Sequence, residues 1–120
     1  MEIKRPTIYA IQALREYQNA KQPLTRTDIA QRLDISIAYS TKIHRILIEA
    51  GFLEGIRGPQ GGHRLVKDLT KTTIAELIRQ IDGGLLEDEG GETKDMLAIR
   101  RKLRRALGGK GWGEPASELL

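Results

Sequence analysis

The stretch GIRGPQGGHRL, from Gly55 to Leu65, constrains the fold of this chain more than any other segment. It lies between two short apolar runs, so the pattern predicts two antiparallel strands joined by a turn. Glycine-rich loops can also bind phosphate, but both the Walker and the dinucleotide spacings are missing, and each requires a strand followed by a helix. The loop is therefore either an ordinary hairpin turn or a tip whose glycines bring the backbone close to a partner.

Two helices are predicted first in the chain. Apolar residues recur at three- and four-residue intervals from Thr7 to about Ala20, and Pro23 ends this pattern. The second helix begins at TRTD, where Thr25 can cap free backbone N–H groups and Asp28 follows three residues later. Both helices have one apolar face, so both are expected to pack on a common core.

The third predicted helix runs from Ser36, a good N-cap, to Ala50. In the preceding turn, Ala30 is small enough to let two helices approach, and Asp34 can adopt a positive φ. On the third helix the predicted core face comprises Tyr39, Ile43, Ile46, Leu47 and Ala50. The opposite face carries Ala38, Thr41 and Arg45, flanked by Lys42 and His44.

A fourth helix is predicted after the hairpin, from the capping box at Thr73 to Gly83. The composition then changes. Residues 84–92 form an acidic, glycine-rich linker, and residues 93–107 form a strongly basic helix whose apolar stripe is Met96, Ile99, Leu103 and Leu107. Residues 108–120 form a glycine-punctuated tail. We expect residues 1–83 to be one domain and the rest an appendage.

The order of elements is helix, helix-turn-helix, hairpin, helix, which predicts a winged helix with Gly55–Leu65 as the wing. The fold class is thus mainly α with a small antiparallel β-hairpin. On this interpretation, Arg57 and Arg64 stand beside a tip flexible enough to follow a DNA groove.

Composition excludes several classes of site. The chain contains no cysteine and only two histidines, so thiolate metal sites, a cysteine nucleophile and a histidine-rich zinc site are not expected. No paired carboxylates or nucleophile with a base have a recognisable spacing, so we expect no enzyme. We also expect a cytoplasmic protein, because the sequence shows no signal peptide and no membrane-spanning run. Lys and Arg outnumber Asp and Glu by 20 to 16, which permits an anionic partner without requiring one.

Three segments are informative together: DIAQRLDIS, AYSTKIHRILIEAGFL and the wing motif RGPQGGHRL. In these segments the sequence resembles the Rrf-type winged-helix transcriptional regulators of bacteria, with His63 where the family has tyrosine. The resemblance covers residues 5–83 and is looser beyond them. It implies a recognition helix from Ser36 to Ala50 and a wing whose Arg57 reaches the minor groove.

The expected DNA contacts follow from this resemblance, although Tyr39 belongs to the predicted core first. The whole set is Ser36, Ala38, Tyr39, Thr41, Lys42, Arg45, Arg57, Gly58, Gly61, Gly62 and Arg64. The stripe of residues 93–107 has no obvious place in a small winged-helix core, so it is expected to pair with a second subunit. The basic run Arg100–Arg105 would then be the exposed side of that dimerisation helix or an auxiliary DNA contact.

We therefore expect a homodimeric repressor that binds a near-palindromic operator on double-stranded DNA. Many members of the family hold an iron–sulphur cluster through cysteines between the fourth helix and the dimerisation helix. This chain has GGLLEDEGGE there, so we expect no cofactor and no cluster. Control could come from a partner protein, a small-molecule effector or abundance. The alternative is a winged-helix protein-interaction module that no longer binds DNA.

Overall fold

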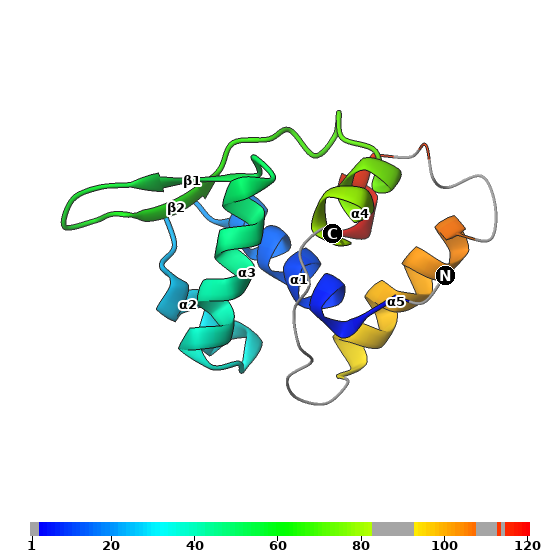
Figure 1. Cartoon of the computed structure of the whole chain (residues 1–120), viewed down its shortest axis with the longest axis horizontal. Coiled ribbons are helices and arrows are strands. Elements are labelled where there is room, and N and C mark those ends of the chain that lie inside the picture. The colour runs from blue at the N-terminus through cyan, green and yellow to red at the C-terminus, as the bar shows by residue number, and fades with distance from the viewer. Residues whose placement is uncertain (1–2, 83–92, 108–112, 114) are drawn as a thin grey trace.

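The computed structural model describes residues 3–82, 93–107, 113 and 115–120. The described residues form five α-helices, one two-stranded antiparallel sheet and a C-terminal 3-10 helix (Figure 1). In chain order the elements are α1 (Arg5–Asn19), α2 (Arg26–Leu33), α3 (Ile37–Glu49), β1 (Leu53–Ile56), β2 (Gly62–Leu65), α4 (Ile74–Asp82), α5 (Lys94–Leu107) and η2 (Ala116–Leu119). This is the predicted winged helix-turn-helix with an additional C-terminal helix. No described helix is long and apolar enough to span a membrane.

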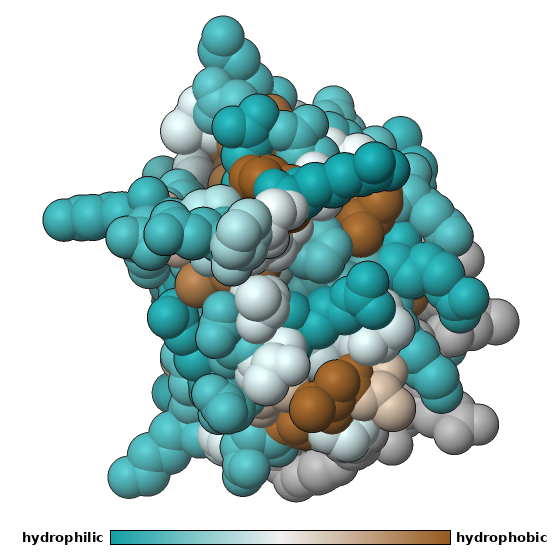
Figure 2. All heavy atoms as spheres, turned by 90° about the vertical axis from the view of Figure 1, so that its left-hand side faces the viewer, coloured by the Kyte–Doolittle hydropathy of each residue, from teal (hydrophilic) through white to brown (hydrophobic). Residues whose placement is uncertain are grey.

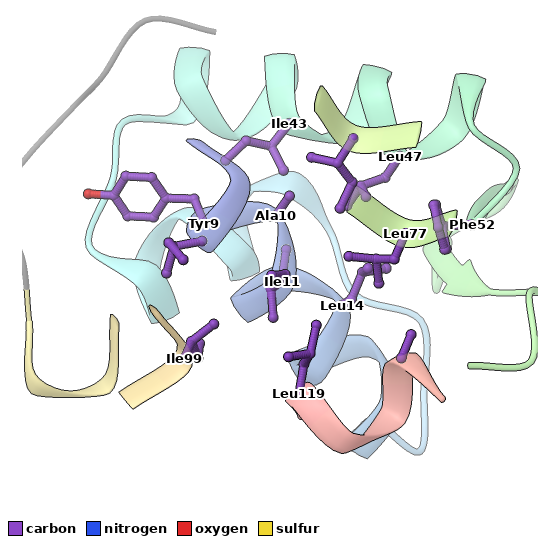
Figure 3. Close-up of a cluster of buried hydrophobic side chains, with 14 of the residues drawn as sticks. Tyr9, Ala10, Ile11, Leu14, Ile43, Leu47, Phe52, Leu77, Ile99 and Leu119 are labelled. Atoms are coloured by element: carbon purple, nitrogen blue, oxygen red, sulfur yellow. The ribbon is translucent and has the colours of Figure 1, made fainter. Parts of the chain in front are cut away.

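Helix α1 is the centre of the molecule. It contacts α2, α3, α4, α5 and β2, so nearly every other element packs around it (Figure 1). Pro6 lies in its first turn, where the missing N–H costs nothing. Ile8, Ile11 and Leu14 are fully buried along the helix and belong to one hydrophobic cluster. Figure 3 shows Ile11 and Leu14 in this cluster with Ile43, Leu47 and Phe52. A helix buried on most of its surface is typical of a central core element.

Local capping fixes the helix-turn-helix. The Thr25 side chain accepts a hydrogen bond from the Asp28 backbone N–H, and the Asp28 carboxylate accepts one from the Thr25 N–H, which completes a capping box. At the other end of α2, Asp34 has φ 56° and ψ 51°, the left-handed conformation expected of it. Ser36 then caps α3 by accepting from the Tyr39 N–H at 3.0 Å.

The hairpin pairs β1 with β2 in a register that places Leu53 opposite Leu65 and Glu54 opposite Arg64. The free edge of β2 is partly covered by the segment between α1 and α2, because Leu24 and His63 exchange two backbone hydrogen bonds, of 3.0 and 2.7 Å. Phe52, just before β1, is fully buried and anchors the root of the hairpin in the core. The hairpin is thus held at its root while its tip extends away from the helices (Figure 1).

Helix α5 is packed against α1 of the same chain, which corrects one expectation. Met96, Ile99 and Leu103 are at most 2% exposed and belong to the same core cluster as α1. The expectation that this stripe has no place in the core is therefore wrong, because its three described members pack within one chain. That the same helix meets a second subunit stays a prediction. The side chain of Leu107, the fourth member, lies outside the described residues.

Polar contacts reinforce the packing of α5. Arg15 on α1 donates two hydrogen bonds to the two carboxylate oxygens of Asp95, at 2.8 and 2.5 Å, and Gln12 donates a third at 2.8 Å. A bidentate arginine with a further donor is a strong arrangement for a partly buried carboxylate. These contacts hold the first turn of α5 on α1.

The end of the chain also enters the core. Thr73 and Pro115 form an isolated bridge, and the Ala116 and Ser117 N–H groups donate to the carbonyls of Thr72 and Leu69. Ala116 and Leu119 are buried and share the cluster with α5. Residues 115–120 are therefore a packed part of the fold, whereas the predicted linker 84–92 lies outside the described residues.

Candidate nucleic-acid interface

Helix α3 presents the polar and basic face expected of a recognition helix. Ser36, Ala38, Lys42 and Arg45 are exposed, and Thr41 is half-buried. The Thr41 hydroxyl donates to the Ile37 carbonyl at 2.9 Å, so its proton is already used within the helix. Ser36 accepts the cap bond from the Tyr39 N–H, which occupies a lone pair of its hydroxyl oxygen. The charged side chains on this face are Lys42 and Arg45, which form no ion pair within the described residues.

Tyr39 lies in the core, as the helical periodicity predicts and against its place in the expected DNA-contact set, whereas His44 does not lie where it was expected. Tyr39 is 4% exposed, and its ring packs edge-on against Tyr9 at 5.5 Å between centroids. It is thus a core residue in this structure and not part of the exposed face. His44, predicted to flank that face, is 1% exposed and points into the core.

The wing tip is exposed from Arg57 to Gln60. Its turn closes through a 2.9 Å hydrogen bond from the Gly61 N–H to the Gly58 carbonyl, and Gly58 adopts φ 113°. A Cβ at Gly61 would collide with the Ile56 carbonyl oxygen, and one at Gly62 would lie 2.5 Å from the Leu24 carbonyl oxygen. These two glycines are therefore required by the backbone itself, so their place in the wing motif has a structural cause.

The two arginines of the wing differ in their electrostatic surroundings. Arg64 donates to the Glu54 carboxylate at 2.6 Å, directly across the two strands. This pair offsets the charge of Arg64 and holds its side chain along the hairpin. Arg57 is exposed at the end of β1 and has no such partner in the described part of the chain. Arg57 is therefore the available cation of the wing.

A buried polar network lies beneath the junction of α3 with the hairpin. The Nδ1 of His44 is 2.7 Å from the Ser40 carbonyl, which can only accept, so Nδ1 carries the proton. The Tyr17 hydroxyl then donates to Nε2 at 2.7 Å, and its oxygen also lies 3.2 Å from the Leu24 carbonyl. The His63 ring is next to it, 5.0 Å from the His44 ring between centroids. This network connects α1, α3 and β2.

Burial sets the ionisation of the network. It lowers the pKa of His44 from 6.5 to about 4, with the bond to Ser40 acting in the opposite direction. Burial also lowers the pKa of His63 and raises the pKa of the Tyr17 hydroxyl well above its usual range. All three groups are therefore neutral at pH 7, so the network itself carries no charge.

The periodicity of the third helix did not predict this network, because it placed His44 beside the exposed face. A signal was present in the spacing: Ser40, His44 and Leu47 lie at i, i+4 and i+7, which is one helical stripe. The buried face of α3 is Tyr39, Ser40, Ile43, His44 and Leu47, with Ile46 and Ala50 only half-buried. Among the described residues, no three side chains of histidine, aspartate or glutamate come together as a metal site would need.

Comparisons with known proteins agree with this architecture. The protein BadM of Rhodopseudomonas palustris is 29% identical over 108 residues, which are 89% of this chain and 66% of BadM. The HTH-type transcriptional regulator IscR of Vibrio vulnificus is 33% identical over 76 residues, which are 62% of this chain and 45% of IscR. The matched stretches thus span less than two thirds of the length of these relatives.

A solved structure and a family match complete the comparison. The structure of CymR, the global cysteine regulator of Bacillus subtilis, superposes with a TM-score of 0.69 at 22% identity, and covers 99% of this chain and 95% of CymR. At that identity the superposition shows a shared fold. The Rrf2 family, described as iron-dependent transcriptional regulators, matches residues 3–107. The chain therefore belongs to the Rrf2 family, a family of transcriptional regulators and not of enzymes.

Proposed function

We propose that this chain is a sequence-specific DNA-binding regulator that inserts α3 into the major groove and lays the wing along the adjacent backbone and minor groove. The observation that carries the proposal is the exposed face of α3, with Lys42 and Arg45, next to a wing that presents Arg57. A helix of this kind fits the major groove of B-DNA, and its N-terminal residues meet the base edges. Figure 2 views this side of the molecule, where hydrophilic side chains predominate.

The three cations of the interface are expected to contact different parts of the DNA. Arginine can bond a guanine edge through two N–H groups, so Arg45 suits direct base contact, whereas the point charge of Lys42 suits a phosphate. Arg57 at the wing suits the narrow, electronegative minor groove of A·T-rich DNA. The other wing residues of the expected contact set have structural roles. Gly58 allows the positive φ of the turn, and Gly61 and Gly62 leave room for neighbouring carbonyl oxygens. Arg64 is held along the hairpin by its hydrogen bond to Glu54.

We propose further that the protein acts as a homodimer on a near-palindromic operator and that it represses. One recognition helix and one wing cover only a half-site, and a two-fold dimer matches a two-fold site. Repression requires nothing beyond occupancy of the operator, which a small protein with a DNA-binding face can achieve. Because it acts on DNA, its place would be the cytoplasm.

The family description implies iron, so the residues must be tested against it. Iron–sulphur clusters are held chiefly by cysteine thiolates, and this chain contains no cysteine. His44 is committed to Ser40 and Tyr17 inside the core. The residues present therefore do not fit a thiolate-held cluster, and we propose that this member works without one. Its regulatory input would then be a partner protein or a small-molecule effector.

The proposal is tested by selecting duplexes bound by the full chain from a random DNA library. The expected result is an inverted repeat whose half-sites lie about one helical turn, or a multiple of it, apart. Affinity for the selected duplex should fall steeply with salt, because bound Lys and Arg release counterions from the DNA. The matched control is the variant Lys42→Ala/Arg45→Ala. If no sequence is enriched and binding is weak at low salt, the protein-interaction module is the better interpretation.

A further inference from the structure

The first turn of α3 exposes an apolar side chain that the DNA-contact set above does not include. Ile37 is the first residue of the helix and is 56% exposed, the largest value among the large hydrophobic residues of the described chain. Ala38 beside it is exposed as well. Single exposed apolar residues are common on protein surfaces, so exposure alone assigns no role to Ile37.

Its position and surroundings make Ile37 informative. The N-terminal residues of a recognition helix are those that approach the base edges. Nothing about helix formation favours isoleucine here, because β-branched residues have modest helix propensity and Ser36 already supplies the cap. Core packing does not explain it either, since more than half of the side chain is exposed. On the side of the molecule that carries the wing, apolar side chains emerge only as small patches among hydrophilic ones (Figure 2).

The polar groups near Ile37 are already engaged. The Ser36 hydroxyl oxygen accepts from the Tyr39 N–H, and the Thr41 hydroxyl donates to the Ile37 carbonyl. Beside these hydroxyl groups, Ile37 and Ala38 expose methyl groups at the beginning of α3, and the cations Lys42 and Arg45 follow one to two turns later. In the major groove, the one apolar group on a base edge is the C5-methyl of thymine.

We infer that Ile37, together with Ala38, is a specificity-determining contact for a thymine methyl group in the operator. The inference rests on the proposed DNA binding. Arg45 follows Ile37 by eight positions, which is about 12 Å along the helix axis, or roughly three to four base pairs. Each half-site should therefore contain a thymine within about four base pairs of the position that Arg45 contacts.

The test removes the methyl group alone. Duplexes selected by the full chain are remade with deoxyuridine in place of one thymine at a time. At the thymine read by Ile37, this change should weaken binding by wild-type protein about fourfold, the factor expected for burying one methyl group. With Ile37→Ala the same replacement should change affinity by less than about twofold. Ile48→Ala is the matched control, because Ile48 is 40% exposed at the opposite end of the same helix; it should keep the fourfold effect.

A second probe adds the methyl group instead. A duplex with cytosine at the same position should bind wild-type protein more tightly when that cytosine is 5-methylated, and Ile37→Ala should show no such gain. If the selected duplexes contain no thymine whose methyl matters, or if the loss is the same in Ile37→Ala, the inference is overturned while the proposed function stands. If no duplex is selected at all, the proposed function itself fails.

Discussion

Replacing Leu103 with alanine should destabilise the whole protein, because α5 is part of the core and not a separate appendage. Leu103 is 1% exposed and belongs to the cluster that α1 organises. Truncating a buried leucine to alanine costs about 2 to 5 kcal/mol, a large part of the roughly 5 to 15 kcal/mol that stabilises a domain. For 120 residues the entropy of unfolding is about 0.25 kcal/mol per kelvin, so a loss of about 3 kcal/mol lowers Tm by about 12 °C.

The assay is urea and thermal unfolding followed by circular dichroism, at two protein concentrations. Leu97→Ala is the matched control: it is the same substitution on the same helix, but Leu97 is 44% exposed and should lose less than about 0.5 kcal/mol. The difference between the two variants should be the same at both concentrations, since the packing lies within one chain. If Leu103→Ala and Leu97→Ala unfold within about 0.5 kcal/mol of each other, α5 does not pack on α1 as described.

Three further predictions concern the interface and the network beneath it. Arg45→Ala should cost about 1 to 3 kcal/mol of binding free energy at the selected DNA site and change which bases are preferred there. Lys42→Ala should weaken binding to all DNA sequences alike and reduce the slope of log affinity against log salt concentration by about one. Gly62→Ala should destabilise the protein by more than about 1 kcal/mol, because its Cβ would meet the Leu24 carbonyl, while Gly55→Ala, with no contact closer than 4.0 Å, should be near neutral. The pKa of His44 is 6.5 in the unfolded chain and about 4 in the folded one, so protons bind the unfolded chain more tightly. Lowering the pH from 7 to 5 should therefore reduce the free energy of unfolding by about 2 kcal/mol. A urea titration at both pH values should show a smaller reduction in His44→Gln.

The winged helix-turn-helix could be predicted from sequence because local signals determine it. The Thr25–Asp28 capping box, the Ser36 cap and the left-handed Asp34 each act within a few residues, and all three lie where the sequence predicts them. The wing motif was also informative, because Gly61 and Gly62 are needed by the backbone itself. Family membership follows from the same stretch and is confirmed by the match over residues 3–107.

The place of α5 could not be predicted in the same way. An amphipathic stripe of Met96, Ile99 and Leu103 shows that one face is buried but not which surface buries it. That choice depends on α1, which lies at least 75 positions earlier in the chain and contacts α5 as well as α2, α3 and α4. The Arg15–Asp95 pair, which fixes the docking, is equally non-local. Contacts of this kind leave no mark on local periodicity.

Helix α3 and the wing, the two elements proposed to contact DNA, are joined by contacts in the core as well as by the chain between them. Leu24, between α1 and α2, pairs with His63 of the wing, while Tyr17 of α1 bonds His44 of α3. The rings of His44 and His63 are in contact, tilted by 49° with 5.0 Å between their centroids, so the recognition helix also meets the wing directly. Each of these bonds is neutral and buried, so it is directional without the desolvation cost of a charge. Hydrogen bonds in the core therefore tie α3 to α1 and the wing root to the segment after α1, and a ring contact joins α3 to the wing.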